Sequence, residues 1–326
     1  MAADIPEFPE FRPLTIDDRE TVEHGFAWLG REPSEFTFAC FYLFRESAQP
    51  GLSRLGDALL FRERCRGGGW CLLPPMLSER ADAVAEEVLR TAQERPAAGV
   101  PRHIYGVTEQ TWRRFFEPSG RFQRRADRDN FDYVYERSDL AELRGNRYHS
   151  KKNLVNQFLR HHGFEYRRLS ADLVAPAREL AEHWCRMRCG SLGSISRYEV
   201  TALIEGLSLH EQLGLAVGVI LVDGQVQAVS LGERLTADTA AIHFEKAGPG
   251  IKGLSQLMTR EFAAREFTDC RYFNREQDLG SPGLRKAKES YYPVRMVEKH
   301  VVTLAGDPAG GEHFQYVADP GQEEQP

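Results

Sequence analysis

The corner at residues 272–293 constrains the fold more than any other part of the chain, because a strand ends there, a turn follows and a short basic helix begins. Residues 278–280 have turn chemistry, since glycine adopts backbone conformations that branched residues resist. Ser281 suits an N-cap, and Pro282 suits the first helical position, where its missing N–H costs nothing. Pro293 disfavours helical geometry at the residue before it, which predicts that the helix ends near Ser290.

Charged side chains gather at this corner and make it a candidate site. Glu276 and Asp278 stand where the strand stops, and the helix that follows carries Arg285, Lys286 and Lys288. Polar groups at the carboxyl end of a strand commonly line a crevice. A helix start with unpaired N–H groups and nearby cations suits an anionic group such as a phosphate or carboxylate. The alternative is a solvated corner with surface ion pairs.

The second half of the chain alternates strands and helices. Residues 215–222 and 225–233 predict a hairpin, because Asp-Gly between two apolar runs is a strong hairpin signal. A strand is predicted at 239–246, a helix at 252–266 and another strand at 270–274. This mixture indicates an α+β fold.

The first half of the chain ends in a similar pattern. Ile104 and Tyr133 lie in predicted strands 29 residues apart, as do Tyr272 and Val301, and a short helix is predicted between the members of each pair. The equal spacing indicates two duplicated mixed α/β domains.

The predicted strand at 239–246 carries two titratable groups. Alternation along a strand places His243 and Glu245 on one face, with Ile242 and Phe244 on the other. Glu245 is therefore a candidate base. His243 would either orient Glu245 or be a hydrogen-bonded histidine of the core.

A glycine-rich loop at residues 247–253 follows this strand and precedes a predicted helix. Such a loop exposes backbone N–H groups at a helix start, where they can cradle a phosphate. It matches neither the Walker nor the dinucleotide fingerprint, and the alternative is a plain tight turn. Its place after three strands resembles the pyrophosphate loop of the GNAT-like (acyl-CoA N-acyltransferase-like) fold. The residues expected to bind a donor there are Gly248, Gly250, Lys252 and Gly253.

The segment at residues 144–168 is strongly basic, with seven Lys and Arg against one acid, Glu165. Part of it lies in a helix predicted from apolar spacing within 140–162. The segment would either bind the phosphates of a donor or form a solvated helix face. The donor-binding candidates are Arg144, Arg147, Lys151 and Lys152.

Composition limits the remaining possibilities. A net charge of −6 argues against a protein-wide nucleic-acid footprint and against DNA as a partner. The six cysteines form no C-x-x-C pair, so reduced thiols are expected and no metal site, although Cys185 and Cys189 are one helical turn apart. No signal peptide is visible, and the longest apolar run, 215–222, is too short to span a bilayer. A cytoplasmic protein without an integral membrane segment is expected.

Three ordered blocks carry a resemblance to a known family. They are residues 139–153, residues 243–247, and residues 274–280 with 284–291. Together they are similar to the soluble, domain-of-unknown-function branch of the phosphatidylglycerol lysyltransferase C-terminal domain family, over roughly residues 10–305. The chain differs from the lipid enzymes of that family by lacking their membrane portion, which argues against a phospholipid acceptor.

The resemblance implies two tandem GNAT-like domains, as in the Fem-type peptidyltransferases. The expected organisation is an N-terminal domain at 1–140, a basic bridging helix and linker at 141–170, a C-terminal domain at 171–305, and an acidic, disordered tail at 306–326. Relatives with known activity move an aminoacyl group from aminoacyl-tRNA to a lipid or peptide.

Three functions remain open on this evidence. The first is transfer of an aminoacyl group from aminoacyl-tRNA to a small or peptide-like amine or hydroxyl by direct attack, with tRNA as a partner. The second is acyl-CoA-dependent N-acylation, and the third is ligand binding without catalysis. No tightly bound cofactor is expected in any of them. For the enzymes, the catalytic candidates are Glu276, Asp278, Glu245 and His243, and Asn274 joins the donor-binding set.

Overall fold

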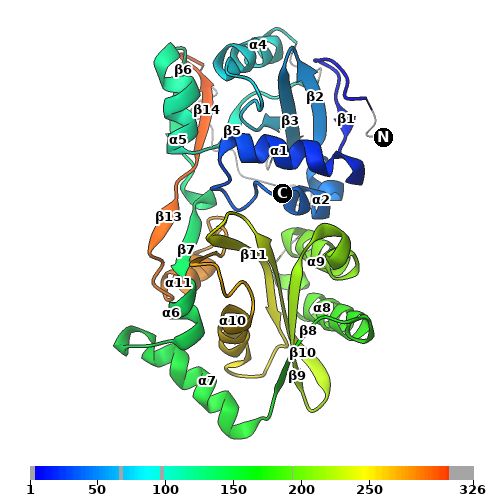
Figure 1. Cartoon of the computed structure of the whole chain (residues 1–326), viewed down its shortest axis with the longest axis vertical. Coiled ribbons are helices and arrows are strands. Elements are labelled where there is room, and N and C mark those ends of the chain that lie inside the picture. Colours follow the sequence, from blue (N-terminus) through cyan, green and yellow to red (C-terminus); the bar gives the residue numbers. More distant parts are fainter. Residues whose placement is uncertain (1–3, 66–68, 96–98, 193, 308–326) are drawn as a thin grey trace, which may run out of the picture. The chain divides into compact units, whose positions relative to one another are not determined.

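A computed structural model describes residues 4–65, 69–95, 99–192 and 194–307, with the side chains of all of these except 188–196. The described chain forms two compact units. The first unit comprises residues 4–131, 278–280 and 297–307, and the second comprises 132–277 and 281–296. Each unit contains one seven-stranded sheet with helices, which confirms the α+β class (Figure 1). Among the described residues, no helix combines the length and apolar character needed to cross a bilayer.

The sheet of the first unit is antiparallel except for one neighbouring pair of parallel strands, β4 and β5. Its helices include α1 (Arg19–Leu29), α2 (Phe38–Leu43), α3 (Arg45–Ala48), α4 (Ala81–Glu94) and α5 (Glu109–Thr111). In spatial order its strands are β1 (Arg12–Pro13), β2 (Gly51–Leu55), β3 (Ala58–Arg64), β4 (Trp70–Leu72), β5 (Ile104–Val107), β14 (His300–Leu304) and β6 (Phe122–Ala126).

The sheet of the second unit also contains one parallel pair, β11 and β12. In spatial order its strands are β13 (Arg295–Val297), β7 (Asp132–Glu136), β12 (Tyr272–Asn274), β11 (Thr239–Ala247), β10 (Gln225–Arg234), β9 (Ala216–Val222) and β8 (Glu165–Arg168). Its helices are α6 (Arg137–Glu142), α7 (His149–His161), α8 (Ala171–Leu192), α9 (Ser194–Leu213), α10 (Leu254–Arg265) and α11 (Pro282–Glu289).

Helices cover both faces of this second sheet. Helix α10 packs on β9, β10 and β11 from one side together with α6 and α7, and α8 and α9 pack on the other side (Figure 1). The core on the α10 side is rich in aromatic residues, and it includes Tyr133, Tyr148, Phe158, Phe262 and Phe273.

The two halves of the chain exchange one strand each. Strand β7 leaves the first half and pairs with β12, whereas β14, the last strand of the chain, pairs with β5 and β6. The division therefore differs from the expected one, in which residues up to 140 formed one domain and 171–305 the other. The equal spacing of Ile104–Tyr133 and Tyr272–Val301 reflects this reciprocal exchange, because those residues lie in β5, β7, β12 and β14.

Local predictions at the corner and at the hairpin are confirmed. Ser281 caps α11 by accepting the N–H of Leu284, Pro282 is its first residue, and the helix ends at Glu289. Asp223 and Gly224 form the turn between β9 and β10, both with positive φ, as a two-residue hairpin turn requires. The expected tail lies outside the described residues from 308 onward.

Cys65 and Cys71 depart from the expected reduced state. They form a disulfide, because the β3–β4 hairpin brings their Cα atoms to 5.6 Å. Cys270 is a free, buried thiol. The sequence separation of six residues gave no signal for this pair, whereas the hairpin register explains it.

Candidate functional site

Strands β11 and β12 separate at the candidate site. They pair only at Thr239–Tyr272, Ala240–Phe273 and Ala241–Asn274, and β11 then continues to Ala247 without β12 beside it. The side chains of the expected site, from residues 243–245 and 274–276, lie at or beyond this point of separation. A sheet that opens between two parallel strands provides a natural entrance for a ligand.

A β-bulge at His243 shapes β11. Phe244 pairs with Leu231 and Ile242 pairs with Gly232, so His243 is an extra residue. The close approach needs glycine at 232, where a Cβ would lie 2.4 Å from the carbonyl oxygen of Ala241. The bulge breaks the predicted alternation and places Glu245 on the α10 side with Ile242. His243 therefore does not orient Glu245, and each of the two side chains has its own hydrogen-bond partners.

His243 is hydrogen-bonded to two carboxylates, one at each ring nitrogen. Its Nε2 lies 2.9 Å from Oε1 of Glu233, and its Nδ1 lies 2.7 Å from Oε1 of Glu276. Burial alone would lower the pKa of His243, but the hydrogen bonds to Glu233 and Glu276 outweigh burial and raise the pKa to about 10. The imidazole is therefore a cation at neutral pH and donates from both nitrogens.

Glu276 is the member of this cluster that reaches solvent. Its side chain is 25% exposed, compared with 10% for Glu233 and 2% for His243. The carboxylate of Glu276 is therefore the part of this cluster that a ligand can reach from solvent. Such a group can bind an ammonium or accept a proton.

Glu245 has its own partners. Its Oε1 accepts a hydrogen bond from Thr259 Oγ1 at 2.6 Å and lies 3.3 Å from Arg275 Nη2. Both members of this ion pair are largely buried. Glu245 is therefore neutralised by Arg275, a residue that the sequence interpretation did not select.

Two cations lie over the ring of Tyr291, and a third, Lys288, donates to the carbonyl of Arg275. Lys151 Nζ lies 4.5 Å from the centroid of the Tyr291 ring and Arg275 Cζ lies 4.9 Å from it. Burial and the charge of Arg275 lower the pKa of Lys151, and they lower the pKa of Lys288 to about 8. Glu245 is the ion-pair partner of Arg275, and the charges of Glu276, Asp132 and Glu245 act against the lowering of the Lys288 pKa.

The remaining basic candidates lie further out. Arg144, whose side chain is 80% exposed, pairs with Glu142, and Arg147 pairs with Asp139. Lys152 is exposed on α7, Lys286 is exposed on α11, and Arg285 is partly exposed on α11. Of the four α7-region candidates, Lys151 is the one that contacts Tyr291.

Asp278 is separated from Glu276 although only one residue, Gln277, lies between them in the chain. It belongs to the first unit and is fully buried. Its Oδ2 lies 3.1 Å from Arg128 Nη1, and its Oδ1 accepts the N–H of Gly280 at 2.9 Å. This geometry favours a structural role for Asp278. The positive φ of Glu276 turns the chain between the two carboxylates.

Asn274 is also fully buried, with both ends of its amide used inside the protein. Its Nδ2 donates to Asp132 Oδ2 and its Oδ1 accepts the N–H of Glu276, each at 2.9 Å. Contact with a donor, as expected from the sequence, is disfavoured by this burial. Asp132 gave no sequence signal, because it lies 142 residues away in β7.

Part of the glycine-rich loop at residues 247–253 packs against helix α7. Gly253 has φ +86°, and a Cβ there would lie 2.1 Å from the carbonyl oxygen of Leu154 on α7. The N–H of Gly248 donates to the Gln227 carbonyl at 2.7 Å. Around Gly250, with φ +92°, nothing lies within 4 Å of an added Cβ, and Lys252 is exposed.

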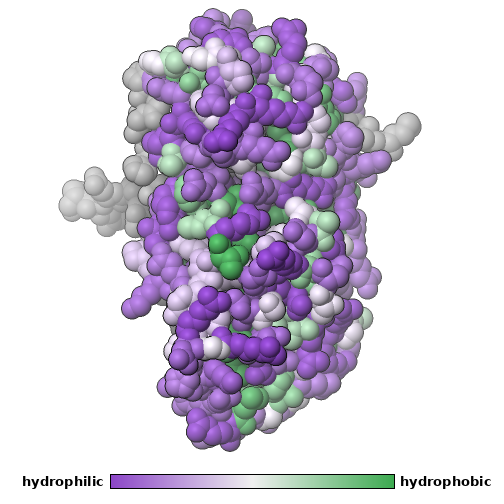
Figure 2. Space-filling model, turned by 60° about the vertical axis from the view of Figure 1, so that its left-hand side comes forward, coloured by the Kyte–Doolittle hydropathy of each residue, from purple (hydrophilic) through white to green (hydrophobic). Residues whose placement is uncertain are grey.

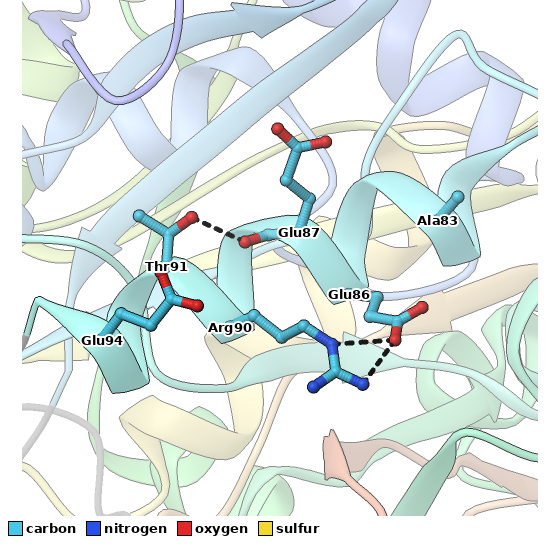
Figure 3. A pocket seen from close by; sticks show the side chains of 6 residues that line it. All are labelled: Ala83, Glu86, Glu87, Arg90, Thr91 and Glu94. Atoms are coloured by element: carbon cyan, nitrogen blue, oxygen red, sulfur yellow. Dashed lines mark hydrogen bonds and ion pairs between the residues drawn. The ribbon is translucent and has the colours of Figure 1, made fainter.

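Hollows elsewhere on the described surface make weaker candidates. One is lined by six residues of α4 alone, and Glu86–Arg90 and Thr91–Glu87 bonds connect four of them (Figure 3). Another lies beside Arg168 and Arg234, which are ion-paired with Glu266 and Asp269. Neither gathers free charged groups from several elements.

A few large apolar side chains of the second unit are exposed. Leu284, Tyr292 and Val294 are 41%, 43% and 46% exposed. Figure 2 shows a small apolar patch within a mainly hydrophilic face. Exposed apolar residues of this number are ordinary on protein surfaces, so we assign them no role.

Solved structures share this fold. A conserved protein of unknown function from Bacteroides thetaiotaomicron VPI-5482 has a TM-score of 0.78 and 29% identity, covering 90% of this chain and 99% of that one. The C-terminal domain of a putative lysylphosphatidylglycerol synthetase from Agrobacterium fabrum has a TM-score of 0.58 and 14% identity, covering 89% and 93%. FemX has a TM-score of 0.51 and 10% identity, covering 92% and 98%. The shared fold confirms two GNAT-like domains.

A match at the level of sequence families is more specific than the shared fold. No match is found among curated proteins. The family model described as phosphatidylglycerol lysyltransferase, C-terminal, matches residues 26–303, which is most of the chain. The chain therefore belongs to the phosphatidylglycerol lysyltransferase C-terminal family.

Proposed function

We propose that this protein transfers an aminoacyl group from aminoacyl-tRNA to a small or peptide-like amine or hydroxyl. The family is one of acyltransferases, and its resemblance to aminoacyl-tRNA-dependent relatives supports this donor. A lipid acceptor is the less favoured choice.

One observation carries the proposal. The carboxylate of Glu276 is partly exposed and is held 2.7 Å from a buried imidazolium at the point where β11 and β12 separate. The hydrogen bond to His243 fixes the direction of the Glu276 side chain. A partly exposed carboxylate can bind the ammonium form of an acceptor and accept a proton during attack.

The reaction would proceed by direct attack. The acceptor nitrogen or oxygen forms a bond to the ester carbonyl carbon of the donor, and the bond from that carbon to the ribose oxygen breaks. Glu276 takes the proton that the nucleophile loses, and the leaving ribose oxygen takes up a proton to become a hydroxyl. The products are the aminoacylated acceptor and free tRNA, with no covalent enzyme intermediate.

Three cations of the second unit would bind the donor's negative charge. Lys151, Arg275 and Lys288 come from α7, the segment after β12 and α11, and the first two lie over the ring of Tyr291. A phosphate near the 3′ end of the tRNA can form charge-assisted hydrogen bonds with such cations. Further out, the exposed cations Arg144, Arg147, Lys152, Arg285 and Lys286 would contact the tRNA backbone.

Gly250 favours an alternative donor, acyl-coenzyme A. The space around its Cα and its position before α10 suit a pyrophosphate near the helix start, with Lys252 beside it. The packing of Gly253 against α7 reduces the part of the loop available for this purpose.

Label transfer from two donors tests the proposal. Purified protein is incubated at low salt with a mixed pool of radiolabelled aminoacyl-tRNA, and separately with labelled acetyl-coenzyme A, each with and without cell extract. Extract-dependent movement of label from tRNA into a new product is the expected result. Use of acetyl-coenzyme A alone would favour the alternative, and silence from both donors would favour a non-catalytic ligand-binding protein.

A further inference from the structure

The backbone of Glu276 is held in a conformation that glutamate rarely adopts. Its φ of +58° lies in the left-handed region, which costs a non-glycine residue about 1 kcal/mol or more. In this conformation the side chain reaches His243, and the chain beyond it turns away from β11. Surrounding contacts must therefore stabilise a conformation that the residue itself disfavours.

Asn274 supplies one of these contacts. Its Oδ1 accepts the N–H of Glu276 at 2.9 Å, which fixes the peptide two residues further on. The direction of the amide is set by its other end, because Nδ2 donates to Asp132 Oδ2 at 2.9 Å. Asp132 and Asn274 are both fully buried, so water does not compete for these bonds.

Three more contacts hold the same turn. The second oxygen of Asp132, Oδ1, accepts from Gln277 Nε2 at 2.8 Å. The carbonyl of Glu276 accepts from Tyr133 N at 3.1 Å, and Lys288 Nζ lies 3.4 Å from the same oxygen. Asp132 therefore accepts hydrogen bonds from Asn274, which precedes Glu276 in the chain, and from Gln277, which follows it.

We propose that Asp132 and Asn274 are positioning residues that hold Glu276 in its left-handed conformation and so direct its carboxylate onto His243. The inference rests on the proposed function for its catalytic consequence, although the geometry can be tested without it. Asp132 lies in β7, the strand that the first half of the chain contributes to this sheet. The strand exchange thus supplies part of the support of the site.

Exchanging the two side chains separates this role from simple packing. Asn274→Asp places two carboxylates against each other. Asp132→Asn leaves one acceptor oxygen in place of two, so residue 132 can no longer accept from both Asn274 and Gln277. In the double variant an amide at 132 can donate to a carboxylate at 274, which still accepts the N–H of Glu276. The single variants should disturb Glu276, Asn274→Asp more strongly, and the double variant should restore it.

The titration of His243, followed by NMR of ¹³C,¹⁵N-histidine-labelled protein, reports the geometry directly. The signal is assigned with His243→Gln, and Glu276→Gln shows its position when the Glu276 charge is absent. Asn274→Asp should move the His243 titration to lower pH, toward that of Glu276→Gln, and the double variant should return it toward wild type.

The first unit offers a matched control. Asn130 Nδ2 donates to Asp127 Oδ2 at 2.9 Å, and both residues are buried. Asn130→Asp therefore creates the same kind of carboxylate pair away from Glu276. It should lower the melting temperature and leave the His243 titration as in wild type.

Folded Asn274→Asp protein with an unchanged His243 titration would overturn the proposal. If that variant does not fold, Asp132→Asn and the double variant decide by the same signal. Where transfer is measurable, Asn274→Asp should lower kcat roughly 100-fold with KM for the donor within about twofold. Absence of transfer in wild type would refute the proposed function and leave the NMR result valid.

Discussion

His243 Nδ1 lies 2.7 Å from Oε1 of Glu276, a residue 33 positions away, while its other nitrogen is bonded to Glu233. A histidine with a carboxylate on each nitrogen is a fixed cation, unsuited to act as a base at neutral pH. Its effect is to hold the carboxylate of Glu276 in place, which leaves Glu276 to contact the substrate.

The charge on His243 predicts how stability depends on pH. Its pKa is raised from 6.5 to about 10 by its carboxylate partners, against the effect of burial. The stabilisation is therefore complete below about pH 6.5 and is lost as pH rises through about 10. The wild-type free energy of unfolding should fall relative to His243→Gln by about 1.4 kcal/mol per pH unit between these limits.

Urea unfolding of both proteins at several pH values from 6 to 10 measures this difference. Comparison with His243→Gln is needed because Lys288, with its pKa lowered to about 8 by burial and Arg275, gains stability over part of the same range. Parallel curves for the two proteins would contradict the assigned charge.

Glu233 should matter for stability more than for the acceptor. It is nearly buried and pairs with His243. Glu233→Gln leaves a buried cation with one charged partner and should destabilise the protein by about 3 kcal/mol, measured by urea unfolding at pH 7. A loss below about 0.5 kcal/mol would show that the ion pair with Glu233 does not form.

Adjacent lysines on α7 test the donor site. Lys151 contacts Tyr291 and is half-buried, whereas Lys152 is exposed. Lys151→Met should weaken aminoacyl-tRNA binding about tenfold, because it removes a directed charge, and Lys152→Met about twofold, through the general field. Filter binding across a salt series measures both. Equal losses would mean that α7 contributes only diffuse charge.

Two glycines of the 247–253 loop should respond differently to alanine. At Gly253 the added Cβ meets the Leu154 carbonyl at 2.1 Å, so Gly253→Ala should cost about 3 kcal/mol of stability or more. At Gly250 there is space, and the cost should be about 1 kcal/mol from the positive φ alone.

Thermal unfolding together with titration of coenzyme A separates packing from ligand binding. Loss of coenzyme A binding in folded Gly250→Ala would favour the alternative donor. If Gly253→Ala is as stable as wild type, the carbonyl of Leu154 on α7 does not lie as close to Gly253 as the structure places it.

The sequence predicted those parts of the structure that depend on local chemistry. Ser281 and Pro282 start α11 because cap and first-turn preferences act within one turn, and Asp223-Gly224 makes its hairpin for the same kind of reason. His243 and Glu276 were both selected as candidates because polar groups at strand ends are visible in a single segment.

The parts that the sequence missed depend on distant partners or on irregular strands. Asp132 meets Asn274 through the exchange of β7, which no local pattern announces. Strict alternation was wrong at His243 because a bulge inserts one residue there. Asp278 was grouped with Glu276 from proximity in the chain, whereas the positive φ of Glu276 sends the two into different units.

Single-turnover transfer from labelled aminoacyl-tRNA by wild type and Glu276→Gln tests the central claim most directly. Both proteins are compared at saturating donor with the extract fraction that accepts label, and donor binding is measured in parallel. Glu276→Gln should bind the donor like wild type but transfer at least about 100-fold more slowly. Equal transfer rates for the two proteins would show that Glu276 neither binds the acceptor nor takes its proton.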